Sequence, residues 1–389
     1  MDGMKRGIIT LIKSAITGEK LPLPEGFSLQ EAMEQIGRHG LQALCYQGGF
    51  HCGIPRNDPA MVMLFQRYCQ AMIRSEGQMA AISQLFAAFE EAGIDYMPLK
   101  GVNLKLLYPK PELRSMGDAD ILIRMEQYDR IVPIMEDLGY QFKEETDHEL
   151  PWRSKALIVE LHKRLIPSYN RDYHAYYGDG WQLGKPCQGH RYAMTDEDTY
   201  VYLFSHYAKH YRDGGIGCRH VTDLWVWRRS HPDMDDSYIR RELEKLQLDV
   251  FFDNTQQLLE VWFQDAEADE RTAFMTDFIF VSGNFGLLEN RALSYGVKTS
   301  KTAAAVKGEW LRQLCEALFP GRKTMEKQYP VLVNRSWLIP LFWPIRILDK
   351  LLFQRKTVER RQRTLKALTA ENVDSHRKAL QYVGLDFNF

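Results

Sequence analysis

Two aspartates, Asp118 and Asp120, stand one residue apart at the head of an apolar run that continues over 121–123. Side chains at positions i and i+2 of a strand project from the same face, so we expect these carboxylates to lie side by side. Like charges that close repel each other unless cations lie between them. A pair of Mg²⁺ or Mn²⁺ ions gripping a triphosphate would supply those cations. The alternative interpretation is a solvated strand end.

A lysine–glycine pair precedes the aspartates. The short apolar run over 97–99 ends in Lys100-Gly101 and opens into a helix-compatible segment that contains Asn103. Because glycine has no side chain, backbone N–H groups can approach a phosphate at a helix N-terminus. Lys100 is then predicted to reach the β- and γ-phosphates of a nucleotide, and Asn103 to donate from the first helical turn. A plain strand-to-helix turn is the alternative.

These motifs resemble those of the DNA polymerase beta-like nucleotidyltransferase superfamily, which has a glycine turn, a D-x-D pair on the next strand and a third carboxylate on a later strand. They are most similar to a bacterial branch described as an uncharacterised nucleotidyltransferase family. The shared motifs are Leu99-Lys100-Gly101, Tyr108-Pro109, Arg114, Asp118-x-Asp120 and Glu160-Leu161-His162.

The resemblance is strongest over 94–165, with a weaker echo over 195–227. Its glycine-to-D-x-D part also resembles the nucleotidyltransferase toxins of abortive-infection systems. One departure is that Gly101-Val102 stands where many superfamily members have Gly-Ser. A hydroxyl contact to phosphate must therefore come from elsewhere in the chain.

The resemblance implies roles for three more residues. Glu160 fits the third carboxylate, which would bind a metal with Asp118 and Asp120 and assist deprotonation of the attacking hydroxyl. His162, on the same strand face, would position the nucleophile or bond a carboxylate. Arg114 would contact a phosphate or hold Asp118 through a bidentate hydrogen bond. Asp120→Asn is expected to abolish transfer and to leave thermal stability nearly unchanged or raised.

The weaker echo places a second polar cluster on two predicted helices. His206 and His210 are one helical turn apart, and Arg219 and Asp223 repeat that spacing on the next helix. We predict that these four residues line the far wall of the cleft and contact base, ribose or acceptor. The alternative is a polar network that locks the two helices together. A two-histidine metal site would lack a third ligand fixed by spacing.

The activity implied is a two-metal transfer of NMP from an NTP, such as ATP, to a hydroxyl-bearing acceptor. The acceptor would be RNA, a protein or a small molecule. Two other functions stay open: a non-catalytic nucleotide-binding or regulatory protein on the same fold, and a phosphotransferase.

Composition narrows the class of protein. At 389 residues the chain is expected to hold two or three domains. A net charge of −1 argues against broad coating of nucleic acid but leaves room for a local basic groove. The six cysteines form no CxxC pair, so a zinc cage is not expected. The start of the chain lacks a secretory pattern, and we expect a cytoplasmic protein.

The expected fold class is α+β. It comprises an N-terminal helical region with a long connecting helix (1–93), a small mixed-sheet nucleotidyltransferase core (94–194) and a helical C-terminal domain (195–389). Asn57-Asp58-Pro59 opens the long helix, whose Met and aromatic seam is predicted to be core. Core strands are predicted at 95–99, 119–123, 140–144 and 156–162, and core helices at 102–107 and 127–138. Later helices are predicted from 195 and around 219–230, 236–248, 250–262, 270–281 and 302–318.

The segment 337–366 combines an aromatic part interrupted by prolines with a basic run. It could lie on a membrane surface as a peripheral contact, or it could pack over the helical domain. Packing is the preferred interpretation. No apolar run reaches about 18 residues, the length that a transmembrane segment needs.

Overall fold

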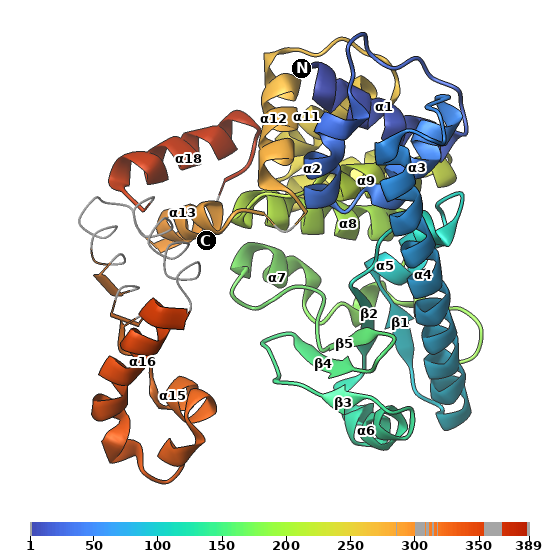
Figure 1. Cartoon of the computed structure of the whole chain (residues 1–389). Helices are drawn as coiled ribbons and strands as arrows, with labels where there is room; N and C mark the ends of the chain where they lie inside the picture. The colour runs from blue at the N-terminus through green and yellow to red at the C-terminus, as the bar shows by residue number, and fades with distance from the viewer. Residues whose placement is uncertain are drawn as a thin grey trace. The chain divides into compact units, whose positions relative to one another are not determined.

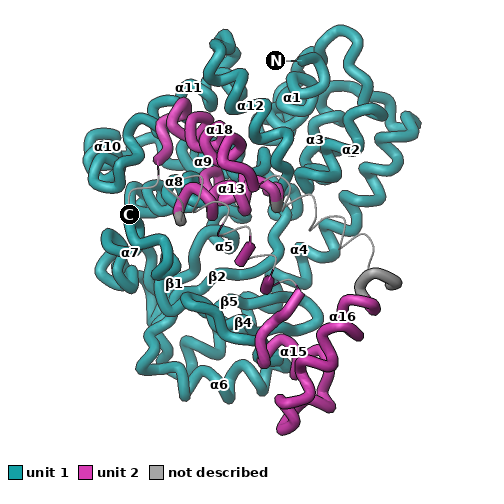
Figure 2. Tube along the Cα trace, turned by 90° about the vertical axis from the view of Figure 1, so that its left-hand side faces the viewer, with its two compact units in different colours: residues 1–209, 216–284, 388–389 teal, residues 210–215, 285–387 magenta. Residues whose placement is uncertain are grey.

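The computed structural model describes residues 2–284, 286–299, 308, 311–312, 315–316, 318–353 and 368–386. Its fold is α+β, with a small mixed sheet among many helices (Figure 1). The chain divides into two compact units, which Figure 2 draws in different colours. The first holds 1–209 and 216–284, and the second holds 210–215 and 285–387. The predicted boundaries near 93 and 194 both fall inside the first unit, so the three-domain division stays a prediction.

The N-terminal region is helical, as expected, and ends in the long helix. Its helices are α1 (Gly3–Thr17), α2 (Leu29–His39), α3 (Gln42–His51) and α4 (Pro59–Ala92). The Asp58 carboxylate caps α4 by accepting from the N–H groups of Ala60 and Met61. Pro59 takes the first helical position, where a missing N–H costs nothing. The helix ends after 34 residues at Gly93, whose φ of 63° suits glycine.

The prediction that the Met and aromatic seam of α4 is core is correct only in part. Met61, Ile82 and Phe89 are buried, whereas Phe65 is 48% exposed and Met72 is 40% exposed. A helix of about 50 Å is longer than the elements that cover it. Helices α2 and α3 pack against part of α4, and the sheet covers another part.

Five strands form one mixed sheet. In spatial order they are β1 (Tyr96–Pro98), β2 (Asp118–Ile123), β5 (Ile158–His162), β4 (Glu149–Arg153) and β3 (Gln141–Phe142). Strands β2 and β5 are parallel, and the other neighbours are antiparallel. The sequence does not predict β4, because Pro151 within it is a residue that interior strands rarely hold. A separate hairpin joins β6 (Lys185–Pro186) and β7 (Tyr192–Ala193).

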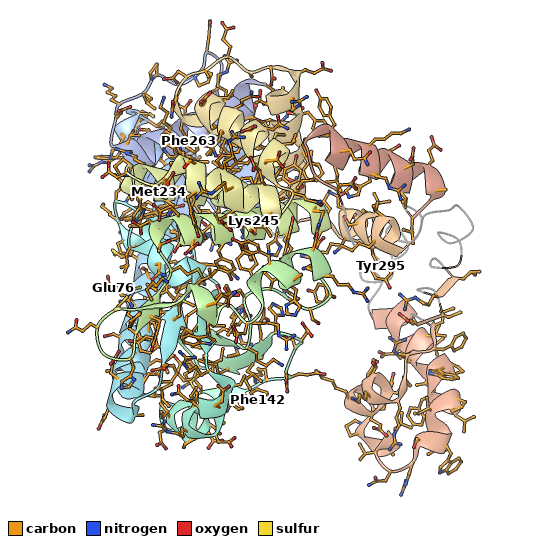
Figure 3. All side chains as sticks on the ribbon, turned by 180° about the vertical axis from the view of Figure 1, so that it is seen from behind. Glu76, Phe142, Met234, Lys245, Phe263 and Tyr295 are labelled. Carbon is orange, nitrogen blue, oxygen red and sulfur yellow. The ribbon has the colours of Figure 1, made fainter. Side chains whose placement is uncertain are left out.

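Alternation along the strands gives the sheet two unlike faces. The apolar face packs against α4 and α6 (Tyr128–Asp137), and it includes Ala119, Ile121, Leu150, Trp152, Val159 and Leu161. Phe142, which Figure 3 labels, lies on the edge strand β3. Its ring contacts that of Trp152 edge-on, with centroids 5.3 Å apart. The opposite face carries polar side chains. Two short helices follow the strands on the chain: α5 (Lys100–Lys105) after β1, and α7 (Arg171–Tyr177) after β5.

The described residues that follow the hairpin lie mainly in helices, as predicted. The first unit continues with α8 (Asp196–Asp213), whose last turn is grouped with the second unit, and then α9 (Cys218–Ser230), α10 (Asp236–Lys245), α11 (Asp249–Phe263) and α12 (Glu270–Ser282). The second unit contains α13 (Leu288–Thr299), α15 (Arg322–Gln328), α16 (Ile339–Phe353) and α18 (Ala370–Tyr382). The predicted helix over 302–318 lies largely outside the described residues.

The aromatic part of the segment 337–366 is divided between packing and exposure. Ile339, Phe342 and Trp343 belong to a small apolar cluster of the second unit, whereas Trp337 is 76% exposed and Leu341 is 64% exposed. The basic run falls on residues outside the described part of the chain. No described helix is both long enough and apolar enough to cross a membrane.

Candidate active site

The parallel register of β2 and β5 brings three predicted carboxylates to one face of the sheet. Asp118 pairs with Ile158, and Asp120 pairs with Glu160. Because side chains alternate along a strand, Asp118, Asp120 and Glu160 project from the face opposite to buried Ala119. We call this polar side the carboxylate face.

Asp120 is held in place from two sides and is 7% exposed. Its Oδ1 accepts a hydrogen bond from His162 Nε2 at 2.9 Å and forms an ion pair with Lys100 Nζ at 3.3 Å. Burial by itself would raise the pKa of Asp120. The Lys100 charge and the His162 hydrogen bond instead hold this pKa well below its usual range. Of the two roles predicted for His162, the structure shows the bond to a carboxylate.

Lys100 reaches the carboxylate face from an unusual backbone conformation. Its φ is 30°, a left-handed conformation that costs about 1–3 kcal/mol in a residue other than glycine. The neighbouring Leu99 N–H donates to the Asp120 carbonyl at 2.9 Å. The Lys100 ammonium lies over the ring of Tyr202 on α8, 5.7 Å from its centroid. Such conformations concentrate at functional sites, where the surroundings enforce them.

Four carboxylates share this face with one lysine. Burial and the charge of Asp120 raise the pKa of Asp118. Burial, together with the charges of the other three acids, raises the pKa of Glu160 to about 8. The fourth acid is Glu149, which opens β4 opposite His162 in the strand register. Four carboxylates against one lysine leave an excess of negative charge on this face, and that excess adds to the effect of burial on the pKa values of Asp118 and Glu160.

A divalent cation fits this set of donors. The groups whose ligand atoms lie within 4.8 Å of one another are Asp120–Glu160–His162 and His148–Glu149–His162. Carboxylate oxygens are the ligands that Mg²⁺ and Mn²⁺ prefer. A cation would also offset part of the charge of the four carboxylates on this face. Asp118 belongs to neither group, so metal binding by Asp118, Asp120 and Glu160 stays a prediction.

Arg114 forms a buried ion pair with Asp223 of α9. Its Nε and Nη2 donate to the two carboxylate oxygens at 2.8 and 2.9 Å, and Tyr108 Oη donates to Asp223 Oδ1 at 2.8 Å. The bidentate bond considered for Asp118 is thus made to Asp223, because α9 brings this carboxylate to the buried guanidinium. The geometry of Arg114 and Asp223 is that of a network between elements, and nucleotide contact by either residue stays a prediction.

Gly101 and Asn103 make local contacts within and beside α5. A Cβ added at Gly101 would lie 3.2 Å from Arg114 Nη1, and the Gly101 carbonyl accepts from that atom at 3.3 Å. Asn103 Nδ2 donates to the Pro98 carbonyl at 2.9 Å. The glycine therefore makes room for the buried arginine. Phosphate contacts by Gly101 and Asn103 stay predictions.

The other residues of the predicted second cluster lie on α8 and α9. Arg219 is near enough to Asp118 for its charge to oppose the rise in the pKa of that carboxyl. The ring of His206 stacks on that of His220, with centroids 6.1 Å apart. His210, one turn later on α8, is grouped with the second unit. Arg219 is thus brought to the aspartates, while nucleotide contact by His206, His210 and Arg219 stays a prediction.

A family model matches most of the first unit. The model, described as "Uncharacterised nucleotidyltransferase", matches residues 25–264, which is more than half of the chain. The chain belongs to this nucleotidyltransferase family. The predicted resemblance is confirmed, and the family region is larger than the motif-bearing stretch over 94–165. It runs from before α2 to the end of α11, so it includes the long helix, the sheet and the helices that carry His206 and Asp223.

One solved structure similar to this nucleotidyltransferase family member is the solution structure of the antibiotic-resistance factor ANT(2'')-Ia, reported to show substrate-regulated conformation dynamics. It is 16% identical, and the match covers 48% of this chain and 97% of that chain at a TM-score of 0.32. No curated protein sequence matches the chain.

The nucleotidyltransferase motifs miss some side chains of the carboxylate face. Glu149, bonded to His148 Nε2 at 2.7 Å, comes from the strand that Pro151 conceals. The alternation of buried Leu150 and Trp152 with more exposed neighbours is the signal that could have revealed this strand. Tyr202 has no comparable signal, because its contact with Lys100 depends on how α8 packs.

Proposed function

We propose that this nucleotidyltransferase family member transfers NMP from an NTP to a hydroxyl-bearing acceptor and requires Mg²⁺ or Mn²⁺. The observation that supports the proposal most is the carboxylate face itself. Two parallel strands present Asp118, Asp120 and Glu160 on one side of the sheet, next to Lys100. The family description independently supports nucleotidyl transfer.

In this proposal Asp118, Asp120 and Glu160 hold the cation. When bound, the cation would neutralise charge on the triphosphate and polarise the attacking hydroxyl. His162 orients Asp120 and keeps it ionised through the 2.9 Å hydrogen bond. Lys100 offers its ammonium to the pyrophosphate part of the NTP.

The transfer step forms one bond and breaks one bond. The acceptor oxygen bonds to the α-phosphorus, and the bond from that phosphorus to the departing pyrophosphate breaks. The hydroxyl proton passes to Glu160, whose carboxylate projects from the same face as Asp118 and Asp120.

The test uses α-labelled and γ-labelled forms of each NTP with cell extract and either Mg²⁺ or Mn²⁺. We expect the α-label to appear on an acceptor with the wild-type protein and to disappear with Asp118→Asn or with EDTA. Transfer of the γ-label would favour the phosphotransferase. Binding of an NTP without transfer under any of these conditions would favour the non-catalytic protein.

A further inference from the structure

A groove with only positive charge among its ionisable groups lies beside the carboxylate face. It has a volume of about 370 Å³ and runs between α4 and the turn that joins β4 to β5. Its charged lining residues are Arg74 of α4, Arg153 at the end of β4 and Lys155 of the turn. None of the described residues that line it is acidic or aromatic.

The three cations are available to a ligand. Arg74, Arg153 and Lys155 are all exposed, and none forms an ion pair with another described residue. Glu76 is the acidic neighbour on α4 (Figure 3), and it does not line the groove. Unpaired cations that converge on one concavity attract anions and raise their local concentration.

The walls of the groove are held in place by hydrogen bonds. In the turn, Ser154 N–H donates to the Leu157 carbonyl at 2.9 Å, and Leu157 N–H donates to Ser154 Oγ at 3.2 Å. On the α4 side, the buried Gln78 Nε2 donates to the Met116 carbonyl at 3.0 Å. A site with fixed walls loses less conformational entropy when a ligand binds.

The position of the groove connects it to the carboxylate face. Gly117, which immediately precedes Asp118, lines the groove, and so does Ile158, which pairs with Asp118 in the strand register. The groove therefore reaches the backbone on either side of the start of β2, next to Asp118, whose own side chain projects from the carboxylate face. The groove carries positive charge, and the carboxylate face carries negative charge. The groove therefore attracts anionic groups, whereas the carboxylate face attracts cations.

We propose that this groove binds the acceptor, and that the acceptor is a small molecule carrying a phosphate group. This inference rests on the proposed nucleotidyl transfer. The volume lies in the range of small-molecule sites. A site for single-stranded RNA would be expected to offer aromatic side chains for base stacking, and this groove has none among its described lining residues. The phosphate binds Arg74, Arg153 and Lys155, and a hydroxyl of the same molecule reaches the α-phosphorus beside Asp118.

The first experiment measures binding of inorganic phosphate by ³¹P NMR line broadening in EDTA and without NTP. Under these conditions the carboxylate face repels anions, so the groove is the site that is tested. Replacing all three groove cations by glutamine (R74Q/R153Q/K155Q) should weaken phosphate binding by about tenfold or more. The matched control K20Q/R67Q/K143Q removes three exposed positive charges elsewhere and should bind phosphate as the wild type does.

Two further variants distinguish an effect on the groove from an effect on folding or on NTP binding. The charge-preserving variant R74K/R153K/K155R should keep phosphate binding. Retained binding would show that the glutamine variant loses phosphate because it loses positive charge, and not because these positions tolerate no substitution. Asp120→Asn should also keep it. Mg²⁺-NTP should bind the glutamine variant as it binds the wild type.

The outcomes distinguish this inference from the proposed function. Phosphate binding that is absent in the wild type, or equal in the wild type and R74Q/R153Q/K155Q, would overturn the groove as an anion site. A labelled single-stranded RNA hexamer that binds the groove far more tightly than phosphate would overturn the small-molecule acceptor. Failure of every Mg²⁺-NTP to bind, with phosphate binding intact, would overturn the proposed function and the acceptor role while leaving the anion site.

Discussion

Two polar clusters of the first unit differ in how their charges are balanced. In the arginine cluster, the Arg114 guanidinium faces the Asp223 carboxylate through two hydrogen bonds, and Tyr108 donates a third. On the carboxylate face, four acids share the ammonium of Lys100, with Arg219 acting on Asp118. Burial, together with the charges of the other three acids, raises the pKa of Glu160 to about 8. A balanced cluster needs no ligand, whereas an unbalanced one gains free energy when a cation binds. The comparison suggests that the first cluster is structural and the second is functional.

The largest expected effect is the loss of transfer when the unbalanced cluster loses an acid. Asp118→Asn should reduce turnover of α-labelled NTP on the order of 10²–10³-fold, the loss seen when an electrostatic stabiliser is removed. The melting temperature should stay unchanged or rise, because burial and Asp120 already raise the pKa of Asp118. Thermal unfolding of the same samples checks this, and a large loss of stability would assign Asp118 to the structure instead.

Asp120→Asn removes a second acid from the carboxylate face. For this substitution the structure changes the expected effect on thermal stability. The sequence suggests that removing the Asp120 charge leaves stability unchanged or raised. The structure shows that Asp120 is held by Lys100 and His162, so the substitution leaves a buried ammonium without its partner. We expect loss of transfer together with a lower melting temperature. An unchanged melting temperature would mean that the ion pair contributes little.

The next largest effect concerns the balanced cluster. Asp223→Asn should lower the free energy of unfolding by about 3–5 kcal/mol, because it leaves the buried Arg114 without a counter-charge. Urea denaturation measures this loss. The double variant R114M/D223L removes both charges and should lose less stability than the single variant. A weakened affinity for Mg²⁺-NTP at unchanged stability would instead place Asp223 at the nucleotide.

Metal removal should have a smaller but clear effect on nucleotide binding. Lys100 is paired with Asp120 and Arg114 with Asp223, and Arg219 acts on Asp118, so these cations do not offset four acids and a triphosphate together. Calorimetric titration of each NTP should give an affinity at least about tenfold higher with Mg²⁺ than with EDTA. Equal affinities would show that the phosphates bind at a site other than the carboxylate face.

The smallest effect is a pH dependence of stability in the absence of metal. The ordinary pKa of Glu160 is 4.5, and burial among the other acids raises it to about 8 in the folded protein. Between these values the folded state binds more protons than the unfolded state, so stability falls as pH rises. In EDTA, the melting temperature should decrease between about pH 5 and pH 8, and it should decrease less for Glu160→Gln. Equal slopes for the two proteins would contradict the raised pKa.

Features that depend on residues close in sequence, such as helix ends and the faces of a strand, could be predicted without the structure. Asp58-Pro59 and Gly93 bound α4 as predicted, because helix caps act within a few residues of the helix ends. Alternation along β2 put Asp118 and Asp120 on one face for the same local reason. The family motifs added Glu160 on a neighbouring strand, and its place opposite Asp120 agrees with that expectation.

Contacts between residues far apart in sequence become visible only in the folded chain. Arg114 bonds a carboxylate 109 residues away, and His162 bonds Asp120 across 42 residues. Glu149 joins the carboxylate face through a strand that its own sequence conceals. The shifts in pKa follow from these contacts, since burial and neighbouring charges change the pKa of a group. Residue types, spacing and the family motifs therefore pointed to Asp118, Asp120 and Glu160, but only the packing shows which charged groups have a partner of opposite charge.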